Sequence, residues 1–115
     1  MSSTHLEIPA TVVRKDEVEW QFSAPGVSKK KLRSDEQTGE STLLLQFDPG
    51  ASYPNHNHPG GEEIYVLEGE LRLGRIELKV GDYLYTPPDG THSVYSKAGC
   101  VVLLRLSKPI VILKD

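Results

Sequence analysis

Short strand-forming segments alternate with turn-forming residues along this chain, and this alternation constrains its fold more than any other feature. The turns recur about every 8–12 residues, which is typical of all-β sandwiches and barrels. No segment repeats its apolar residues with the ~3.6-residue period of an amphipathic helix, so we expect very little helix. The pattern therefore predicts a small all-β domain.

Glycine, proline and aspartate mark where the expected strands begin and end. Gly39 lies in a turn-rich stretch between two strand-like segments, which predicts a hairpin with positive φ at this glycine. Gly74-Arg75 predicts a second hairpin, and Glu68-Gly69-Glu70 is expected to reverse the chain. In chain order, the expected strands cover residues 28–34, 41–47, 63–67, 71–73, 76–80, 83–86, 93–96, 101–106 and 109–113.

The length of the chain suits one domain. A chain of 115 residues can bury a single core, and no repeat or linker divides it. We therefore expect a single domain over residues 1–115, in which residues 1–12 form a flexible arm or an edge strand.

The sequence also suggests a compartment. Cys100 is the only cysteine and cannot form an internal disulfide, which suits a reducing environment. The N-terminal residues lack the basic and apolar regions of a signal peptide, and the apolar runs are far too short to span a bilayer. We expect a cytoplasmic protein with no membrane segment, in which Cys100 is a small buried side chain.

The charge balance argues against a nucleic-acid-binding protein. The chain has 13 basic and 16 acidic residues, a formal net charge of −3, and no concentrated basic face. One basic cluster exists, and because acidic residues follow it we interpret it as a solvated strand end. Its members are Lys29, Lys30, Lys31 and Arg33.

Several expected strands are apolar at consecutive positions, which indicates that both of their faces are covered. These runs read LLL, VVLL and IVIL in the sequence. In a small domain the second cover is often a partner subunit, so we expect a homodimer.

Three histidines and a carboxylate have the spacing of a metal site. His56 and His58 are two residues apart, so in a strand both imidazoles point to the same face. Glu62 or Glu63 can close on the same point after a proline- and glycine-containing bend, and His92 follows a second loop of this kind. Imidazole and carboxylate ligands suit zinc, iron, manganese, nickel, cobalt or copper, and leave coordination positions open for a small molecule.

At these residues the chain resembles the cupin superfamily. The first cupin motif, G-x5-H-x-H-x3-E-x6-G, matches at every fixed position from Gly50 to Gly69. The second, G-x5-P-x-G-x2-H-x3-N, matches from Gly81 to His92, but Asp89 occupies the glycine position and Ser96 the asparagine position. Neither departure affects a residue that binds metal in the family.

The resemblance implies a double-stranded β-helix, also called a jelly roll, with one divalent metal ion. The metal ligands that it implies are His56, His58, Glu62 and His92. The motif spacing favours Glu62 over Glu63, and strand alternation then places Glu63 on the opposite face. Zinc, iron, manganese and nickel all remain candidates for the metal.

More narrowly, the chain resembles the cupin module of ChrR-type anti-sigma factors. The residues that carry this likeness are the stretches NHNHPGGEEIYVLEGEL and PPDGTHSVYSKAGC, with Trp20 and Pro25-Gly26-Val27 upstream. In that family the module carries a metal site, whereas a separate zinc-binding helical domain binds the sigma factor. We find no helical segment of that kind, so only the fold and the metal pocket are carried over.

Other side chains are candidates for the wall of a small-molecule pocket. The tyrosines can offer a hydroxyl to a ligand or pack in the barrel wall with their tips in water. Arg105 lies in an otherwise apolar strand and can hold an anionic ligand or point outward, and we favour the outward position. The tyrosine candidates are Tyr53, Tyr83, Tyr85 and Tyr95.

The fold alone does not determine the function. The nearest resemblance favours a metal-binding module that senses or binds a small molecule. The alternative is an iron-dependent dioxygenase or related oxidoreductase that acts on a small chelating carbonyl compound. A barrel with a vestigial site is the weakest interpretation, and whether the protein is an enzyme stays open.

Overall fold

Ten β-strands and no helix make up the regular structure of residues 9–112, the part of the chain that this computed structural model describes. The all-β prediction is therefore confirmed. The strands are β1 (Gln21–Ala24), β2 (Val27–Ser34), β3 (Ser41–Phe47), β4 (Ser52–His58), β5 (Glu62–Leu73), β6 (Ile76–Lys79), β7 (Tyr83–Thr86), β8 (Gly90–Tyr95), β9 (Cys100–Leu106) and β10 (Val111–Ile112).

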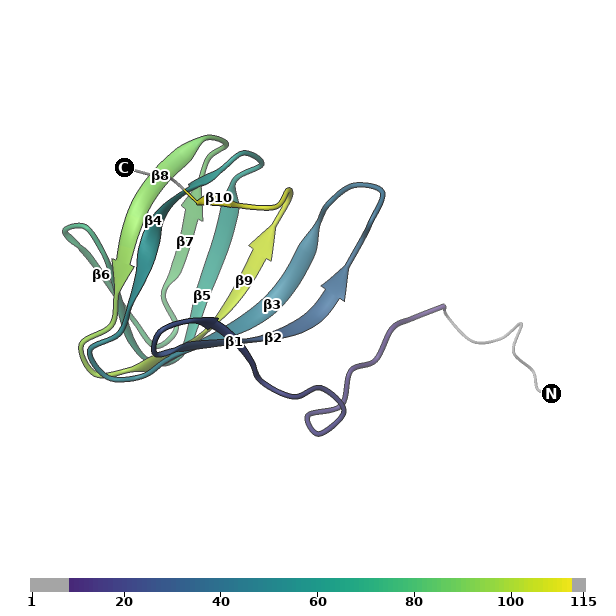
Figure 1. Ribbon diagram of the computed structural model, residues 1–115, viewed down its shortest axis with the longest axis horizontal. Coiled ribbons are helices and arrows are strands. Elements are labelled where there is room, and N and C mark those ends of the chain that lie inside the picture. Colours follow the sequence, from purple (N-terminus) through teal and green to yellow (C-terminus); the bar gives the residue numbers. More distant parts are fainter. Residues whose placement is uncertain (1–8, 113–115) are drawn as a thin grey trace.

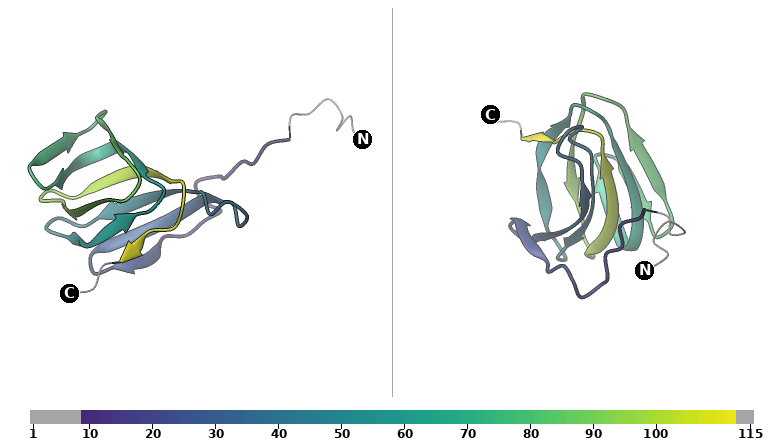
Figure 2. Two further views of the ribbon diagram at one scale, coloured as in Figure 1. Left: turned by 90° about the horizontal axis from the view of Figure 1, so that it is seen from above. Right: turned by 90° about the vertical axis from the view of Figure 1, so that its right-hand side faces the viewer.

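The strands form an antiparallel sheet that curls back on itself into two facing layers (Figures 1 and 2). One layer has the order β1-β2-β3-β9-β5-β7, and the other has the order β10-β4-β8-β5-β6. β5 belongs to both layers, because its first half pairs with β9 and β7 and its second half pairs with β8 and β6. This is the predicted double-stranded β-helix.

The reversal expected at Glu68-Gly69-Glu70 is wrong, because β5 runs without interruption from Glu62 to Leu73. Gly69 does adopt positive φ, at 74°, but it stays in the strand and pairs with Cys100 of β9. The bulge of β5 lies just before it, between Val66 and Glu68. A side chain at position 69 would collide with the carbonyl oxygen of Gly99 in the neighbouring strand region. The bulge bends β5 at the point where it passes from one layer to the other.

The two predicted hairpins are confirmed. β2 pairs with β3 across a turn in which Gly39 has a φ of 81°. β5 pairs with β6 across Gly74, which has a φ of 60°. Glycine meets these positive φ values at little steric cost, which explains why it marks both turns.

The core lies between the layers, where alternate residues of each strand point inward. Along β9, for example, Val102 and Leu104 are 1% and 4% exposed. Arg105, between the buried Leu104 and Leu106, faces outward. Cys100 is buried as predicted. Each large aliphatic side chain buried in this way stabilises the fold by roughly 1.5–3 kcal/mol relative to an exposed one.

The segment before β1, residues 9–20, extends outside the barrel (Figure 1). Most of the predicted arm or edge strand, residues 1–12, lies outside the described residues, and positions 9–12 form no strand. Closer to the barrel, Lys30 of β2 lies 5.0 Å from the centre of the Trp20 ring. Lys30 also donates a hydrogen bond of 3.1 Å to the carbonyl of Lys15, so the segment is held against the outer face of β2.

Among the described residues, none belongs to a helix with the length and apolar character that crossing a bilayer requires.

Candidate metal centre

Two adjacent strands bring the three histidines of the motifs together. His56 and His58 lie on the same face of β4, and His92 of β8 is the direct cross-strand partner of His56. One ring nitrogen of each histidine lies within 4.8 Å of the others, which is close enough for all three to bind one metal ion. His56 and His58 are buried and His92 is partly buried.

Glu62 completes the cluster from the first position of β5. The chain turns after His58, whose carbonyl accepts a hydrogen bond of 3.0 Å from the Gly61 amide. The Glu62 carboxylate then lies 3.2 Å from Nε2 of His58 and 3.3 Å from Nε2 of His92. Glu63 points to the outer face, where it accepts a hydrogen bond of 2.7 Å from the Tyr83 hydroxyl.

Backbone carbonyls orient the two imidazoles of β4. Nδ1 of His56 lies 2.6 Å from the carbonyl oxygen of Pro54, and Nδ1 of His58 lies 3.1 Å from that of Gly90. A carbonyl oxygen only accepts hydrogen bonds, so we assign the ring proton to Nδ1 in both residues. Nε2 then carries a free lone pair. Metal-binding histidines are commonly fixed in this way.

The buried polar atoms at the centre fit a cation. Among the described residues, Nε2 of His58, Nε2 of His92 and Oε1 of Glu62 are buried without a hydrogen-bond partner. Buried polar atoms in native proteins nearly always have partners, so such a cluster needs an explanation. Lone pairs on nitrogen and carboxylate oxygen that converge on one point are the donor set that divalent first-row metals prefer.

The pKa values of these groups follow from burial and from their mutual contacts. Burial raises the pKa of Glu62, but the close contacts with the imidazoles of His58 and His92 outweigh this effect, and the pKa lies below its usual value. Burial lowers the pKa of His58, but Glu62 reverses this effect and the pKa is raised. For His56, burial dominates and the pKa is lowered. Glu62 is therefore held as a carboxylate and His56 as a neutral imidazole, the forms that bind metal.

The loop before His92 departs from the cupin motif at Asp89. Asp89, in the glycine position of the motif, itself adopts a φ of 65°. Its amide donates a hydrogen bond of 2.7 Å to the carbonyl of His58, and its carboxylate accepts one of 3.3 Å from Asn57. Aspartate tolerates the left-handed region better than most residues, which explains why it can replace glycine here.

Substitutions at Asp89 test this explanation. Asp89→Gly is expected to change the free energy of unfolding by less than about 0.5 kcal/mol, because relief of strain is offset by the greater freedom of glycine in the unfolded chain. Asp89→Val is expected to lower it by roughly 1–2 kcal/mol, because a β-branched residue is poorly tolerated at positive φ. Urea denaturation measures both, and equal stabilities of the two variants would contradict the explanation.

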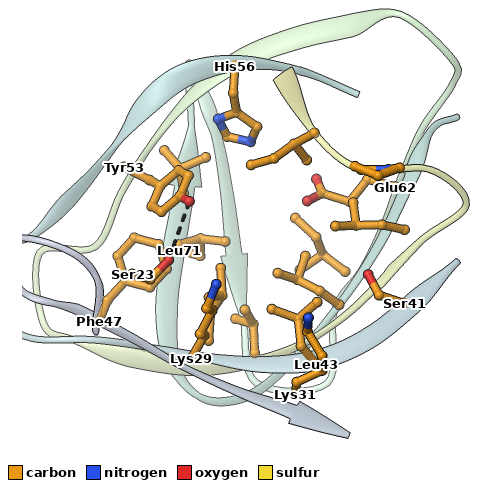
Figure 3. A pocket seen from close by; sticks show the side chains of 18 residues that line it. Ser23, Lys29, Lys31, Ser41, Leu43, Phe47, Tyr53, His56, Glu62 and Leu71 are labelled. Atoms are coloured by element: carbon orange, nitrogen blue, oxygen red, sulfur yellow. Dashed lines mark hydrogen bonds between the residues drawn. The ribbon is translucent and has the colours of Figure 1, made fainter. Parts of the chain in front are cut away.

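An apolar cavity of about 230 Å³ lies inside the barrel, next to the cluster of histidines and Glu62 (Figure 3). His56 and Glu62 form part of its wall, so a molecule in the cavity can reach the cluster. Most of the remaining wall is aliphatic or aromatic. These wall residues are Leu43, Leu45, Phe47, Ile64, Leu71, Val94, Val102, Leu104, Leu106 and Ile110.

Of the pocket candidates taken from the sequence, Tyr53 lines the cavity. Its ring packs edge-on against His56 with the centres 5.2 Å apart, and its hydroxyl accepts a hydrogen bond of 3.3 Å from Ser23.

The other tyrosine candidates and Arg105 lie outside the cavity wall. The exposed fraction is 55% for Tyr83, 56% for Tyr85 and 40% for Tyr95. Arg105 points outward, the position favoured from the sequence, and contacts Glu40 at 3.0 Å and Glu63 at 3.7 Å.

With this geometry in view, the chain can be compared with known proteins. Residues 9–109 match the family described as the ChrR cupin-like domain. The chain belongs to this family. The resemblance inferred from the two cupin motifs is confirmed.

The chain is also similar to individual curated proteins. The chain is 30% identical to the DNA damage-repair/toleration protein DRT102 of Arabidopsis thaliana over 76 residues, which cover 61% of this chain and 23% of that protein. This chain spans about a quarter of the length of the curated relatives that it matches.

Two solved structures show the same fold. A putative acetylacetone dioxygenase from Methylibium petroleiphilum has a TM-score of 0.85 at 21% identity, over 95% of this chain and 84% of that one. A chain in the complex of Rhodobacter sphaeroides SigE with the anti-sigma ChrR has a TM-score of 0.71 at 24% identity, over 81% of this chain and 51% of that one.

Proposed function

We propose that this cupin holds one divalent metal ion and uses it to bind a small molecule from the apolar cavity, in a sensing or binding role. The observation that carries the proposal is the convergence of three histidine ring nitrogens within 4.8 Å, with the buried carboxylate of Glu62 against two of the rings. Four protein ligands leave one or two positions open on a five- or six-coordinate metal. The ligands are His56, His58, Glu62 and His92.

The cavity supports the part of the proposal that concerns a small molecule. It is lined mainly by aliphatic side chains and meets the proposed metal ligands at His56 and Glu62. A pocket of this kind, apolar with a few convergent polar groups, is typical of a ligand-binding site. Tyr53 adds a hydroxyl to the wall beside His56.

An iron-dependent oxygenase is the second candidate. The structural likeness to a putative acetylacetone dioxygenase shows the shared fold, and the apolar wall beside the cluster suits a small carbonyl compound. Iron would supply Lewis acidity and redox chemistry when bound. The chain's own residues would orient the substrate and exclude water from it. Oxygen uptake by iron-loaded protein with acetylacetone would favour this candidate.

The homodimer stays a prediction. The outer face of the first layer carries apolar side chains in register on neighbouring strands, because Leu103 is paired with Leu44 on one side and Tyr65 on the other. A second copy of the chain is the partner that we expect to cover this face.

Elemental analysis of protein purified without a histidine tag tests the metal site. We expect one equivalent of metal in the wild type and in His5→Ala, whose histidine lies outside both motifs, and a loss of most of the metal in His56→Ala. Zinc would support the sensing or binding role, and iron would favour the oxygenase. A wild-type protein that holds no metal, even after incubation with zinc and iron salts, would contradict the proposal.

A further inference from the structure

Two lysines of β2, the partly buried Lys29 and the exposed Lys31, line the cavity whose wall includes His56 and Glu62. Successive residues of a strand point to opposite faces, so Lys29 and Lys31 share the inward face with the buried Val27. Lys30 lies between them on the outer face, against Trp20. Figure 3 shows Lys29 and Lys31 rising from β2 toward the interior of the cavity, across from His56.

The described contacts do not neutralise these two lysines. Among the described residues, the ion pairs and side-chain hydrogen bonds include neither Lys29 nor Lys31. Glu62 is the acidic residue of the cavity wall, and its carboxylate contacts His58 and His92. The cavity therefore has two positive charges on the β2 side and no described negative charge paired with them.

We propose that the ligand of this cavity is a small organic anion, with a carboxylate that contacts Lys29 and Lys31 and a chelating oxygen group that reaches the metal. This inference rests on the proposed metal site and specifies the class of ligand. Positive charges in a cleft with low-dielectric walls attract an anion more strongly than charges in open water. A carboxylate can also accept charge-assisted hydrogen bonds from both ammonium groups.

The size and wall of the cavity define the rest of the ligand. Its volume of about 230 Å³ is below the ~300–1,000 Å³ that is usual for drug-sized ligands, so the molecule is compact. The aliphatic wall between the lysines and His56 suits a short hydrocarbon body. Lysine stems can also simply cover an apolar wall while their charges stay in water, and the experiment below separates that role from anion binding.

The test compares an acid with its neutral ester on metal-loaded protein. Succinylacetone has a β-diketone that can chelate a metal and a carboxylate at its other end, and its methyl ester lacks only the charge. Isothermal titration should show that the wild type binds the acid at least about tenfold more tightly than the ester. The double variant Lys29→Met/Lys31→Met should lose this preference and keep its metal. Lys97→Met, which removes an exposed lysine outside the cavity, should keep the preference.

The outcomes separate this inference from the proposed function. Equal affinity for acid and ester in protein that holds one metal ion, or no binding of either, would overturn the inference and leave the metal site intact. If the protein holds no metal, the proposed function fails, and the lysines are tested on metal-free protein with hexanoate and methyl hexanoate. Tighter binding of hexanoate that is lost in the double variant would then support the inference, and equal binding would overturn it.

Discussion

Replacement of Glu62 by glutamine is expected to weaken metal binding by about a hundredfold or more. Loss of a residue that only orients a metal ligand costs about 10–100-fold in affinity, and loss of a charged ligand should cost at least as much. Glutamine has nearly the same size as glutamate, so the buried position beside His58 and His92 stays filled. The expected defect is therefore one of charge and coordination more than of packing.

The measurement is the rise in melting temperature that metal produces. A ligand that binds only the folded state stabilises it by RT ln(1 + [L]/Kd), so a hundredfold loss of affinity removes about 2.7 kcal/mol of stabilisation at saturating metal. For a domain of this size that corresponds to roughly 10 °C. Comparing each variant with and without metal cancels any effect of the substitution on the metal-free protein.

Glu63→Gln is the matched control. Glu63 is the neighbouring residue of the same strand, but it faces outward toward Tyr83 and Arg105. This variant should keep the full metal-dependent rise in melting temperature. An equal loss of the metal-dependent rise in both variants would show that Glu62 does not act as a specific metal ligand. A loss in Glu63→Gln alone would make Glu63 the ligand and reverse the assignment made from the motif spacing.

The sequence was sufficient to predict most of the strands, the two hairpins and the clustering of the three histidines, although β1 and β4 were not among the expected strands. The reason is that these features depend on local rules. Gly39 and Gly74 allow tight turns that few other residues can adopt. The two-residue spacing of His56 and His58 places both rings on one face of any strand.

Features that depend on distant contacts were not predictable in the same way. Gly69 between two glutamates is compatible with a turn or with a continuous strand, and local residues do not distinguish them. The backbone at Gly99 does so, because it packs directly against Gly69 and continues the pairing of β5 with β9. The sequence pattern therefore predicted a turn at a position where the strand continues.

Which polar side chains point into the cavity also depends on distant contacts. Tyr53 and Tyr85 both lie in strands, but only the register of each strand against its neighbours decides that Tyr53 faces the cavity. The basic cluster shows the same limit. The interpretation as a solvated strand end fits the exposed Lys31 and Arg33 but not the buried Lys30. Only the register from the buried Val27 places Lys29 and Lys31 on the face that lines the cavity.

Gly69→Ala is expected to be the most damaging small substitution in the barrel. Alanine at a φ of 74° costs about 1–2 kcal/mol, and the new methyl group would also collide with the backbone at Gly99. Overpacking of this kind typically adds about 1–3 kcal/mol, so the free energy of unfolding should fall by roughly 3 kcal/mol or more. Urea denaturation of the metal-free protein measures this loss.

Gly74→Ala separates the collision from the backbone strain. Gly74 also has positive φ, at 60°, but an added methyl group there would meet no atom within 4 Å. Its loss should therefore be limited to about 1–2 kcal/mol. Equal losses in the two variants would show that β5 and β9 move apart easily at Gly69. A larger loss at Gly69 would show that β5 is tightly packed there against the backbone of Gly99 and Cys100, where β5 passes from one layer to the other.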